Sequence, residues 1–423
     1  MLLKTTVLHY NIHFMKKHSV ALTAASAVLV GSLSAQSLYN LAPDDTTSES
    51  LPLSYTAGVN LGFDDNPTPL LGFDDDEAMY GQAYVGATFL NQSPQTTLNF
   101  GAQIGVIHYF DNLDAAGQDV DDTAFTASLY LNWTHRVSER LRFVSRNNLT
   151  YELEPDYSVG FQAQRQIGNY FRWSTDNAVG YRWSERLATY TGIRAEGLAF
   201  DDFDGGDRTL ITLYNDFRYQ VSERTVATLT YRYQDVDADA QVTDATNQFV
   251  LVGIEHRFSP TSTLVLRGGV QIRDVDNGAS GSNPYFEGAV RTQVNERFSV
   301  RGYLRYGVED WQRLLTFPNA PGLGVLYSDT ETLRIGFTAD YEISQALSLM
   351  GGINYAFLDF TEQQSPVGPG DVEEELFNAF IGLNYIVNDN LTMNMRYNFE
   401  DLSSDAGRDY DRNRISIGAS TTF

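Results

Sequence analysis

The chain of 423 residues contains no cysteine. A disulfide framework and cysteine-ligated metal sites are therefore excluded. Lysine is almost as scarce, because it occurs only at Lys4, Lys16 and Lys17. Beyond the first 35 residues, no apolar run approaches the length of about 20 residues that a membrane-spanning helix needs. A helical membrane protein is thus excluded for the main part of the chain.

The N-terminus has the features of a secretory signal. Met15, Lys16 and Lys17 precede a short apolar run from Val20 to Leu33, and small residues follow up to Ala35. A charged start, a short apolar centre and a small-residue cleavage site predict a signal peptide over 15–35, cut after Ala35. Residues 1–14 are then an artefact of an upstream start codon, and 36–53 form a periplasmic N-terminal segment. The alternative, a single anchoring helix, would need a longer apolar run.

Positive charge is scarce after the predicted cleavage site. All three lysines lie before it and all 54 acidic residues lie after it, which leaves 26 arginines and a net charge of −28. Such a chain does not bind nucleic acid through bulk charge. The charges are also unevenly distributed along the chain, because many of the acids lie in a few long polar segments.

One short motif recurs along the chain. The string HRVSERLRF at 135–143 has relatives at 181–189, 219–227, 256–264, 292–300, 341–349 and 385–393, and a weaker copy at 90–98. The central Ser or Asn returns at a spacing of roughly 40 residues, which indicates a structural repeat. Eight copies predict eight short turns.

The segments between these turns alternate apolar and polar residues. After the last turn, Leu391, Met393 and Met395 fall on one parity, and Thr392 and Asn394 fall on the other. This pattern predicts a β-strand with one apolar and one polar face. The strands are about ten to fourteen residues long, which suits a tilted crossing of a bilayer.

Long acidic segments connect the hairpins at their other ends. They are predicted at 64–77, 111–122, 201–207, 235–244 and 402–409, together with longer loops at 152–168 and 311–328. Short turns that alternate with long loops are typical of an outer-membrane barrel. We therefore predict one all-β domain over 54–423, a transmembrane antiparallel up-and-down barrel with short periplasmic turns and long acidic extracellular loops. Eight hairpins and a strand at each end give about 18 strands, with 16 as the alternative.

Aromatic residues gather near the predicted turns. They are Trp133, Trp183, Tyr219, Phe258, Tyr341, Tyr385 and the terminal Phe423. Rings at this depth favour the headgroup region of a membrane. A soluble sandwich with ordinary strand aromatics is the alternative, and the repetition at one end of so many strands argues against it.

Three short features of the sequence belong together: Gly62-Phe63-Asp64-Asp65-Asn66 at the end of the first strand, the repeated Ser-Glu-Arg turn, and the final strand that ends in Phe423. In these features the sequence resembles the β-barrel porin families of bacterial outer membranes. The resemblance covers about residues 54–423, and its motifs are short. It implies a location in the outer membrane of a Gram-negative bacterium, and it implies that Phe423 is the signal for the barrel-assembly machinery. Some barrels of this kind are associated with exopolysaccharide export.

The predicted lumen is the only region whose residues suggest a functional site. If Phe423 faces lipid, alternation places Arg412, Arg414 and Ser416 inside, and the same parity places many other arginines there. The candidate selectivity residues are Arg142, Arg146, Arg232, Arg267, Arg291, Arg301, Arg305, Arg334, Arg396 and Arg414. Rings of arginine favour anions in pores. The alternative is that these arginines pair with inward acids and only cover a wet wall, in which case they set no selectivity.

Catalytic and metal-binding patterns are weak. His108, His135 and His256 are the only histidines after the predicted cleavage site, and no GxSxG, Walker or HExxH motif is present. Asp235, Asp237 and Asp239 copy the opening of a calcium loop, but position 246 is Thr and the central Gly is missing. We predict that the protein is not an enzyme and has no metal site and no cofactor.

The leading functional hypothesis is an outer-membrane channel for passive diffusion of small hydrophilic solutes, weakly selective for anions. An export barrel for exopolysaccharides or sugar acids is the first alternative, favoured by the excess of inward arginine. A structural or adhesive barrel is the second. The expected partners are outer-membrane lipid, the assembly machinery and small hydrophilic or anionic solutes. Self-association is left open.

Overall fold

The computed structural model describes most of the chain from residue 53 onward. The described ranges are 53–67, 77–111, 122–153, 169–201, 207–238, 244–276, 280–309, 314–317, 320–363, 370–407 and 409–423. The predicted signal peptide and all but the last residue of the predicted N-terminal segment lie outside these ranges, since β1 begins at Leu53. No helix long and apolar enough to cross a membrane occurs in them.

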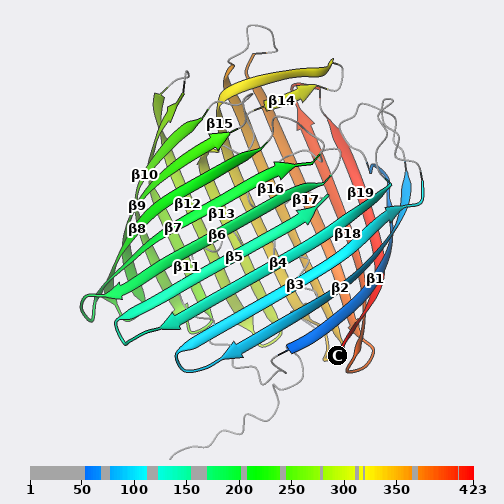
Figure 1. Ribbon diagram of the computed structural model, residues 1–423, viewed down its shortest axis with the longest axis horizontal. Helices are drawn as coiled ribbons and strands as arrows, with labels where there is room; N and C mark the ends of the chain where they lie inside the picture. Colours follow the sequence, from blue (N-terminus) through cyan, green and yellow to red (C-terminus); the bar gives the residue numbers. More distant parts are fainter. Residues whose placement is uncertain are drawn as a thin grey trace, which may run out of the picture.

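Eighteen antiparallel strands form one closed ring, as the sequence predicted (Figure 1). Each strand pairs with its neighbours in the chain, and the ring closes where the first strand, β1, pairs with the last strand, β19. A nineteenth strand, β14, pairs only with β15, while β13 pairs directly with β15 in the wall. Closure removes the exposed strand edges that an open sheet of this size would present.

The strands are long, which matches the tilted crossing inferred from the sequence. Their bounds are β1 Leu53–Asp64, β2 Ala78–Gln92, β3 Thr96–Tyr109, β4 Thr123–Arg136, β5 Leu141–Glu152, β6 Tyr170–Arg182, β7 Leu187–Phe200, β8 Arg208–Ser222, β9 Thr225–Ala238, β10 Ala245–Ser259, β11 Ser262–Val275, β12 Ser280–Asn295, β13 Phe298–Val308, β14 Leu314–Phe317, β15 Ala320–Glu342, β16 Leu347–Gln363, β17 Val372–Ile386, β18 Leu391–Ser404 and β19 Tyr410–Thr422.

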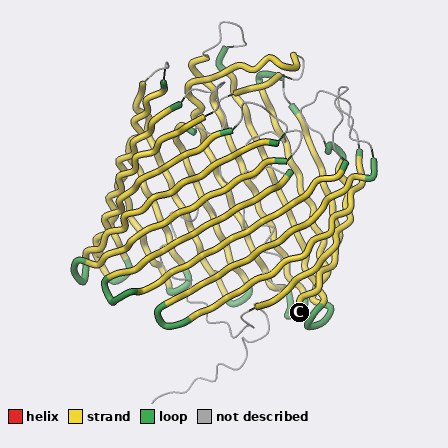
Figure 2. Tube along the Cα trace, in the orientation of Figure 1, coloured by secondary structure: helices red, strands yellow, loops and turns green. Residues whose placement is uncertain are grey.

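All eight predicted turns connect consecutive strands of the ring at one rim (Figure 2). In each turn the recurring Ser or Asn accepts backbone N–H groups two or three residues further on. Ser184 Oγ, for example, accepts the N–H of Leu187 at 3.1 Å, and Asn388 Oδ1 accepts that of Leu391 at 3.0 Å. Side chains of this kind stabilise tight turns by supplying a local acceptor. Because each tight turn needs such an acceptor, the motif recurs along the chain.

The turns are also linked to one another around the rim. The carbonyl of Arg140 in one turn accepts the N–H of Arg182, which precedes the next turn, and Arg186 and Gln220 repeat the contact. At the end of the chain, Asn390 accepts the N–H of Thr422, and Tyr55 and Phe423 exchange backbone hydrogen bonds of 2.8 and 3.0 Å. The terminal strand therefore ends at the rim of the turns.

The opposite rim differs from the prediction in several places. The predicted loop at 235–244 begins later, because β9 continues to Ala238, and the one at 402–409 begins after Ser404. The apolar segment 311–328 is not a plain loop, since β14 forms a hairpin with the first part of β15. Residues such as Leu314, Leu315 and Phe317 suit a paired strand, in which backbone groups hydrogen-bond to each other.

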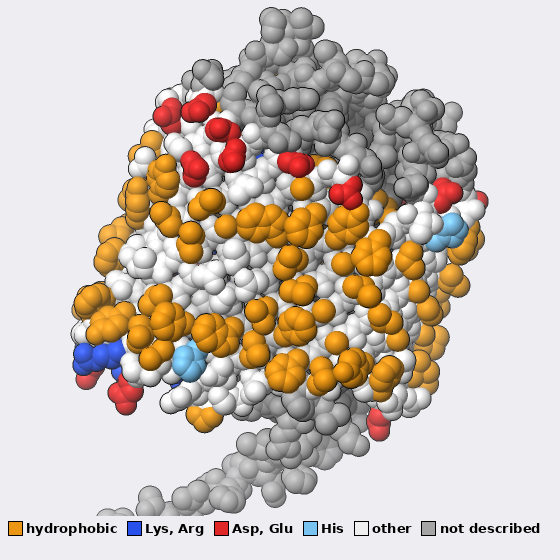
Figure 3. All heavy atoms as spheres, viewed as in Figure 1, with side chains coloured by type: hydrophobic (Ala, Val, Ile, Leu, Met, Phe, Trp, Pro, Cys, Tyr) orange, Lys and Arg blue, Asp and Glu red, His pale blue; other side chains and the backbone are white. Residues whose placement is uncertain are grey.

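The outer surface carries an apolar band between two belts of larger side chains (Figure 3). Trp183, Tyr219, Phe258, Tyr385 and Phe423 are exposed near the rim of the turns, as predicted. Met79, Phe110, Phe125, Tyr231 and Phe286 are exposed toward the opposite rim. Apolar bands flanked by aromatic side chains fit the thickness and the interfaces of a bilayer.

Candidate functional site: the barrel lumen

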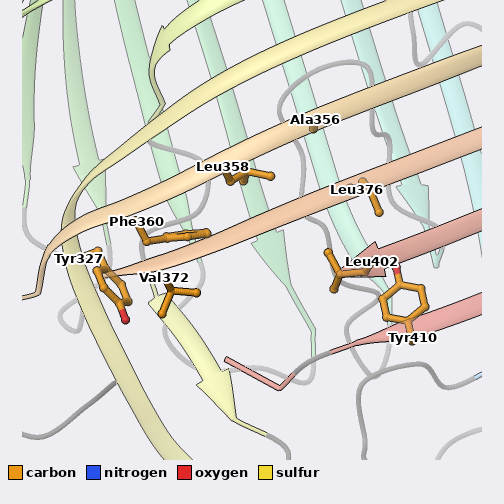
Figure 4. Close-up of a cluster of buried hydrophobic side chains, with 8 residues drawn as sticks. All are labelled: Tyr327, Ala356, Leu358, Phe360, Val372, Leu376, Leu402 and Tyr410. Carbon is orange, nitrogen blue, oxygen red and sulfur yellow. The ribbon is translucent and has the colours of Figure 1, made fainter. Parts of the chain in front are cut away.

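The side chains that point into the barrel form three levels between one rim and the other. Near the rim opposite the turns, the inward side chains are apolar and buried. One such cluster joins Tyr327, Ala356, Leu358, Phe360, Val372, Leu376, Leu402 and Tyr410 along β15 to β19 (Figure 4). A second cluster spans β6 to β11, and a third covers β2 to β4. The middle level is charged, and the level near the turns is polar and partly exposed.

The largest charged network lies on β8 to β12. Glu287 accepts two hydrogen bonds from Arg232, at 2.6 and 3.1 Å, and one from Arg267 at 3.1 Å. Tyr285 donates its hydroxyl to the same carboxylate at 2.8 Å, and Arg267 also lies 3.5 Å from Asp216. All five side chains are buried. The bidentate contact and the shared carboxylate link β9, β11 and β12 across the inner wall.

A second network lies at the seam where the ring closes. Arg412 on β19 donates from Nε to Oδ1 of Asp64 on β1 at 2.9 Å, and its terminal nitrogen contacts the other oxygen. Arg414 donates to the hydroxyl of Tyr80 at 3.0 Å and lies over that ring. Asp64 and Arg412 are 0% and 1% exposed. The pair therefore joins the first and last strands from inside the wall.

Two smaller networks also belong to the charged level. Arg194 contacts Asp176 at 3.0 Å, and Tyr214 donates to the same carboxylate at 2.7 Å. On β15, Arg334 donates to both oxygens of Glu309 at 3.0 and 3.1 Å, and Arg305 contacts the same carboxylate. One carboxylate thus contacts two arginines in this part of the wall.

The candidate arginines differ in accessibility. Arg232, Arg267 and Arg334 are buried in the networks, whereas Arg291 is exposed near the rim of the turns. The others are intermediate: Arg142, Arg146, Arg301, Arg305, Arg396 and Arg414. Arg301 contacts Asp340 at 2.9 Å, and these two side chains are 32% and 27% exposed, so this ion pair faces the open part of the lumen. Arg396 lies over the ring of Phe380 at 5.2 Å.

Sequence reasoning missed several inward charges. Asp64 was predicted to begin an acidic loop, but it ends β1 and is buried against Arg412. Glu374 accepts a hydrogen bond from Ser404 at 2.8 Å, and Asp329 contacts Arg273 at 3.0 Å. Arg208 is also buried in the wall. The alternation of side chains could have identified three of them. The inward positions continue to Asp64 at the end of β1, and they include Arg208 at the start of β8 and Glu374 near the start of β17.

Amide side chains also line the inner wall close to the charged networks. Asn60 donates to Gln82 at 3.0 Å, and Asn354, Asn378 and Asn398 form a row of amide contacts across β16 to β18. Within the described ranges, no group of three or more His, Asp or Glu could hold a metal ion. Of the acids that copy a calcium loop, Asp235 and Asp237 lie on β9, and Asp239 lies outside the described residues.

A closed antiparallel ring with a polar interior, an apolar exterior and short turns at one rim is the architecture of a bacterial outer-membrane barrel. The family model described as Putative beta-barrel porin 2 matches residues 324–423. No curated protein matches the chain.

Three solved structures match the chain at low identity. OccAB4 of Acinetobacter baumannii is 14% identical with a TM-score of 0.45, over 89% of this chain and 99% of that one. OpdK of Pseudomonas aeruginosa, solved with vanillate, is 12% identical with a TM-score of 0.45, over 88% and 99%. A BenF-like porin from Pseudomonas fluorescens is 13% identical with a TM-score of 0.44, over 88% and 98%. Identities this low transfer no solute to this chain.

Proposed function

We propose that the protein is an outer-membrane channel for passive diffusion of small hydrophilic solutes, with weak selectivity for anions. The observation that carries the proposal is the closed ring of 18 strands whose inner wall is polar and charged while its outer wall is apolar. Barrels of about this size enclose a water-filled path. A charged inner wall is stable only where water or paired charges solvate it.

The level of the charged networks is the narrow part of the proposed path. Inward side chains from this level to the far rim are mostly buried, whereas those toward the turns are partly exposed. A solute that enters from the side of the turns would therefore meet the more exposed arginines first. Arg291 and Arg301 lie opposite each other near that rim, and the side chains of Arg301 and Arg305 are 32% and 25% exposed.

The weak anion preference rests on an excess of arginine over acid on the inner wall. Asp64, Asp329 and Glu374 reduce this excess, yet the inward arginines still outnumber the inward acids. Because most of these arginines are paired, we expect only the more open ones to attract solutes. Charges that line a confined channel concentrate ions of the opposite sign.

The first prediction tests this selectivity. In a planar bilayer with a KCl gradient, the wild-type channel should give a reversal potential of the sign that favours chloride. Replacement of Arg301 and Arg305 by Ser should shift the reversal potential toward cation selectivity, because two open positive charges are lost. The matched control is Arg224→Ser, which removes an exposed arginine from a turn.

Two outcomes would contradict the proposal. Clear cation selectivity that is unchanged in the double variant would show that the lumen arginines only neutralise their acidic neighbours. Absence of ion conductance from a correctly folded, membrane-inserted protein would contradict a diffusion channel of any selectivity.

A further inference from the structure

Four adjacent strands carry polar side chains on the face that the proposed location exposes to lipid. They share parity with the exposed Val179, Ile193 and Phe217, so they point away from the lumen. We call them the polar patch: Ser145 and Asn147 on β5, Thr175 and Asn177 on β6, Thr191 on β7, and Asn215 on β8.

The residues of the polar patch contact one another across the strands. Thr175 donates to Asn147 at 2.7 Å and Ser145 donates to Asn177 at 2.7 Å, because the register places these residues opposite each other. Within β5 and β6, Asn147 donates to Ser145 at 3.0 Å and Asn177 donates to Thr175 at 2.7 Å. Asn215 donates to Thr191 at 2.6 Å, again from opposite positions.

The polar patch lies between the two belts of the outer surface. On the rim side of the turns it is bordered by Phe143, Val179 and Phe217, and on the other side by Leu149, Trp173 and Leu213. In Figure 3 a pale area interrupts the orange side chains between the two belts. The patch is therefore placed in the hydrocarbon region rather than at a headgroup interface.

Polar groups at this depth are costly when they face acyl chains, because lipid offers no hydrogen-bond partners. The contacts within the patch lower this cost without removing it. Asn177 and Asn215 each donate one amide hydrogen in these contacts, and an amide has two. At similar depth on other strands the outward residues are apolar, such as Val59 on β1, Val252 on β10 and Ile417 on β19.

We propose that the polar patch is the contact surface for a second copy of this chain, in a twofold arrangement. The proposal rests on the proposed membrane location. The patch is uncharged and presents both donors and acceptors, so it is complementary to itself, as a twofold contact requires. Thr191 and Ala195 on β7 are small, which lets a second barrel approach closely. Hydrogen bonds between the two copies would replace contact between the amides and lipid.

The absence of cysteine gives a direct test, which is the second prediction. Single substitutions Thr191→Cys and Asn177→Cys should each give a cross-linked dimer with a short bifunctional thiol reagent in outer-membrane fractions. The control is Val252→Cys, an exposed lipid-facing position on β10, outside the patch. It should remain a monomer under the same conditions.

A second variant separates the interface from the barrel itself. Replacement of Asn147, Asn177 and Asn215 by Leu should abolish the dimer in native mass spectrometry of nanodiscs, while the protein still enters the outer membrane and stays heat-modifiable. Equal cross-linking at positions 191 and 252, or a wild-type protein that is a monomer in nanodiscs, would overturn the proposal. A cross-link to a protein of different mass would also overturn it. Failure to reach the outer membrane at all would instead contradict the proposed location.

Discussion

At the scale of single residues, the inner wall depends on carboxylates shared between arginines. Glu287 binds both Arg232 and Arg267 in a buried site. The third prediction is that Glu287→Gln destabilises the barrel, because Arg232 and Arg267 lose the buried carboxylate that they share. Removal of one partner from a buried pair typically costs about 3 to 5 kcal/mol. The measurement is the midpoint of urea unfolding in detergent, followed by heat-modifiable mobility.

The matched control uses the open ion pair of the same lumen. Asp340→Asn leaves Arg301 without its carboxylate, but both side chains are partly exposed to solvent. Exposed pairs contribute only about 0 to 1 kcal/mol. A similar loss of stability in both variants would show that burial does not decide the contribution of these acids.

At the scale of elements, each hairpin depends on one Ser or Asn in its turn. Ser184 accepts the N–H groups of Arg186 and Leu187, and Asn388 makes the equivalent contacts with Asn390 and Leu391. The fourth prediction is that Ser184→Ala lowers the free energy of unfolding by about 1 kcal/mol, as for other lost side-chain caps. Denaturant unfolding in detergent measures the difference.

The conservative variant Ser184→Asn should retain most of the stability, because the chain itself uses Asn at 295 and 388 for the same contacts. If Asn and Ala were equally destabilising at 184, the Ser hydroxyl would have a role other than that of a backbone acceptor.

At the scale of the whole molecule, closure joins the first and the last strand of the ring. Phe423 exchanges backbone hydrogen bonds with Tyr55, and their rings stack with centroids 6.4 Å apart. The fifth prediction is that deletion of Phe423 lowers the yield of heat-modifiable barrel in the outer membrane, because closure loses this terminal contact and the assembly machinery loses the proposed signal. Export through the signal peptide should be unaffected.

Phe423→Tyr is the control, since it keeps the ring and the backbone contacts. We expect it to assemble at the wild-type level. Wild-type yield of the deletion variant would mean that the terminal residue serves neither closure nor assembly.

The sequence by itself determined the spacing of the turns, the strand count and the face of most strand residues. These features follow from local chemistry, namely a backbone acceptor in each turn and the alternation of side chains along a strand. Side-chain alternation alone therefore placed Arg232 and Arg267 inside the barrel.

The tertiary structure decided which inward charges meet. Asp64 and Arg412 are 348 residues apart, and only the closure of β1 on β19 brings them together. The alternation of residues along a strand shows which side chains point into the barrel. Which of these side chains touch depends on the register between strands and on the depth at which each strand ends. The register between β5 and β6 likewise brings outward residues that are distant in the sequence, such as Asn147 and Thr175, into one hydrogen-bonded patch.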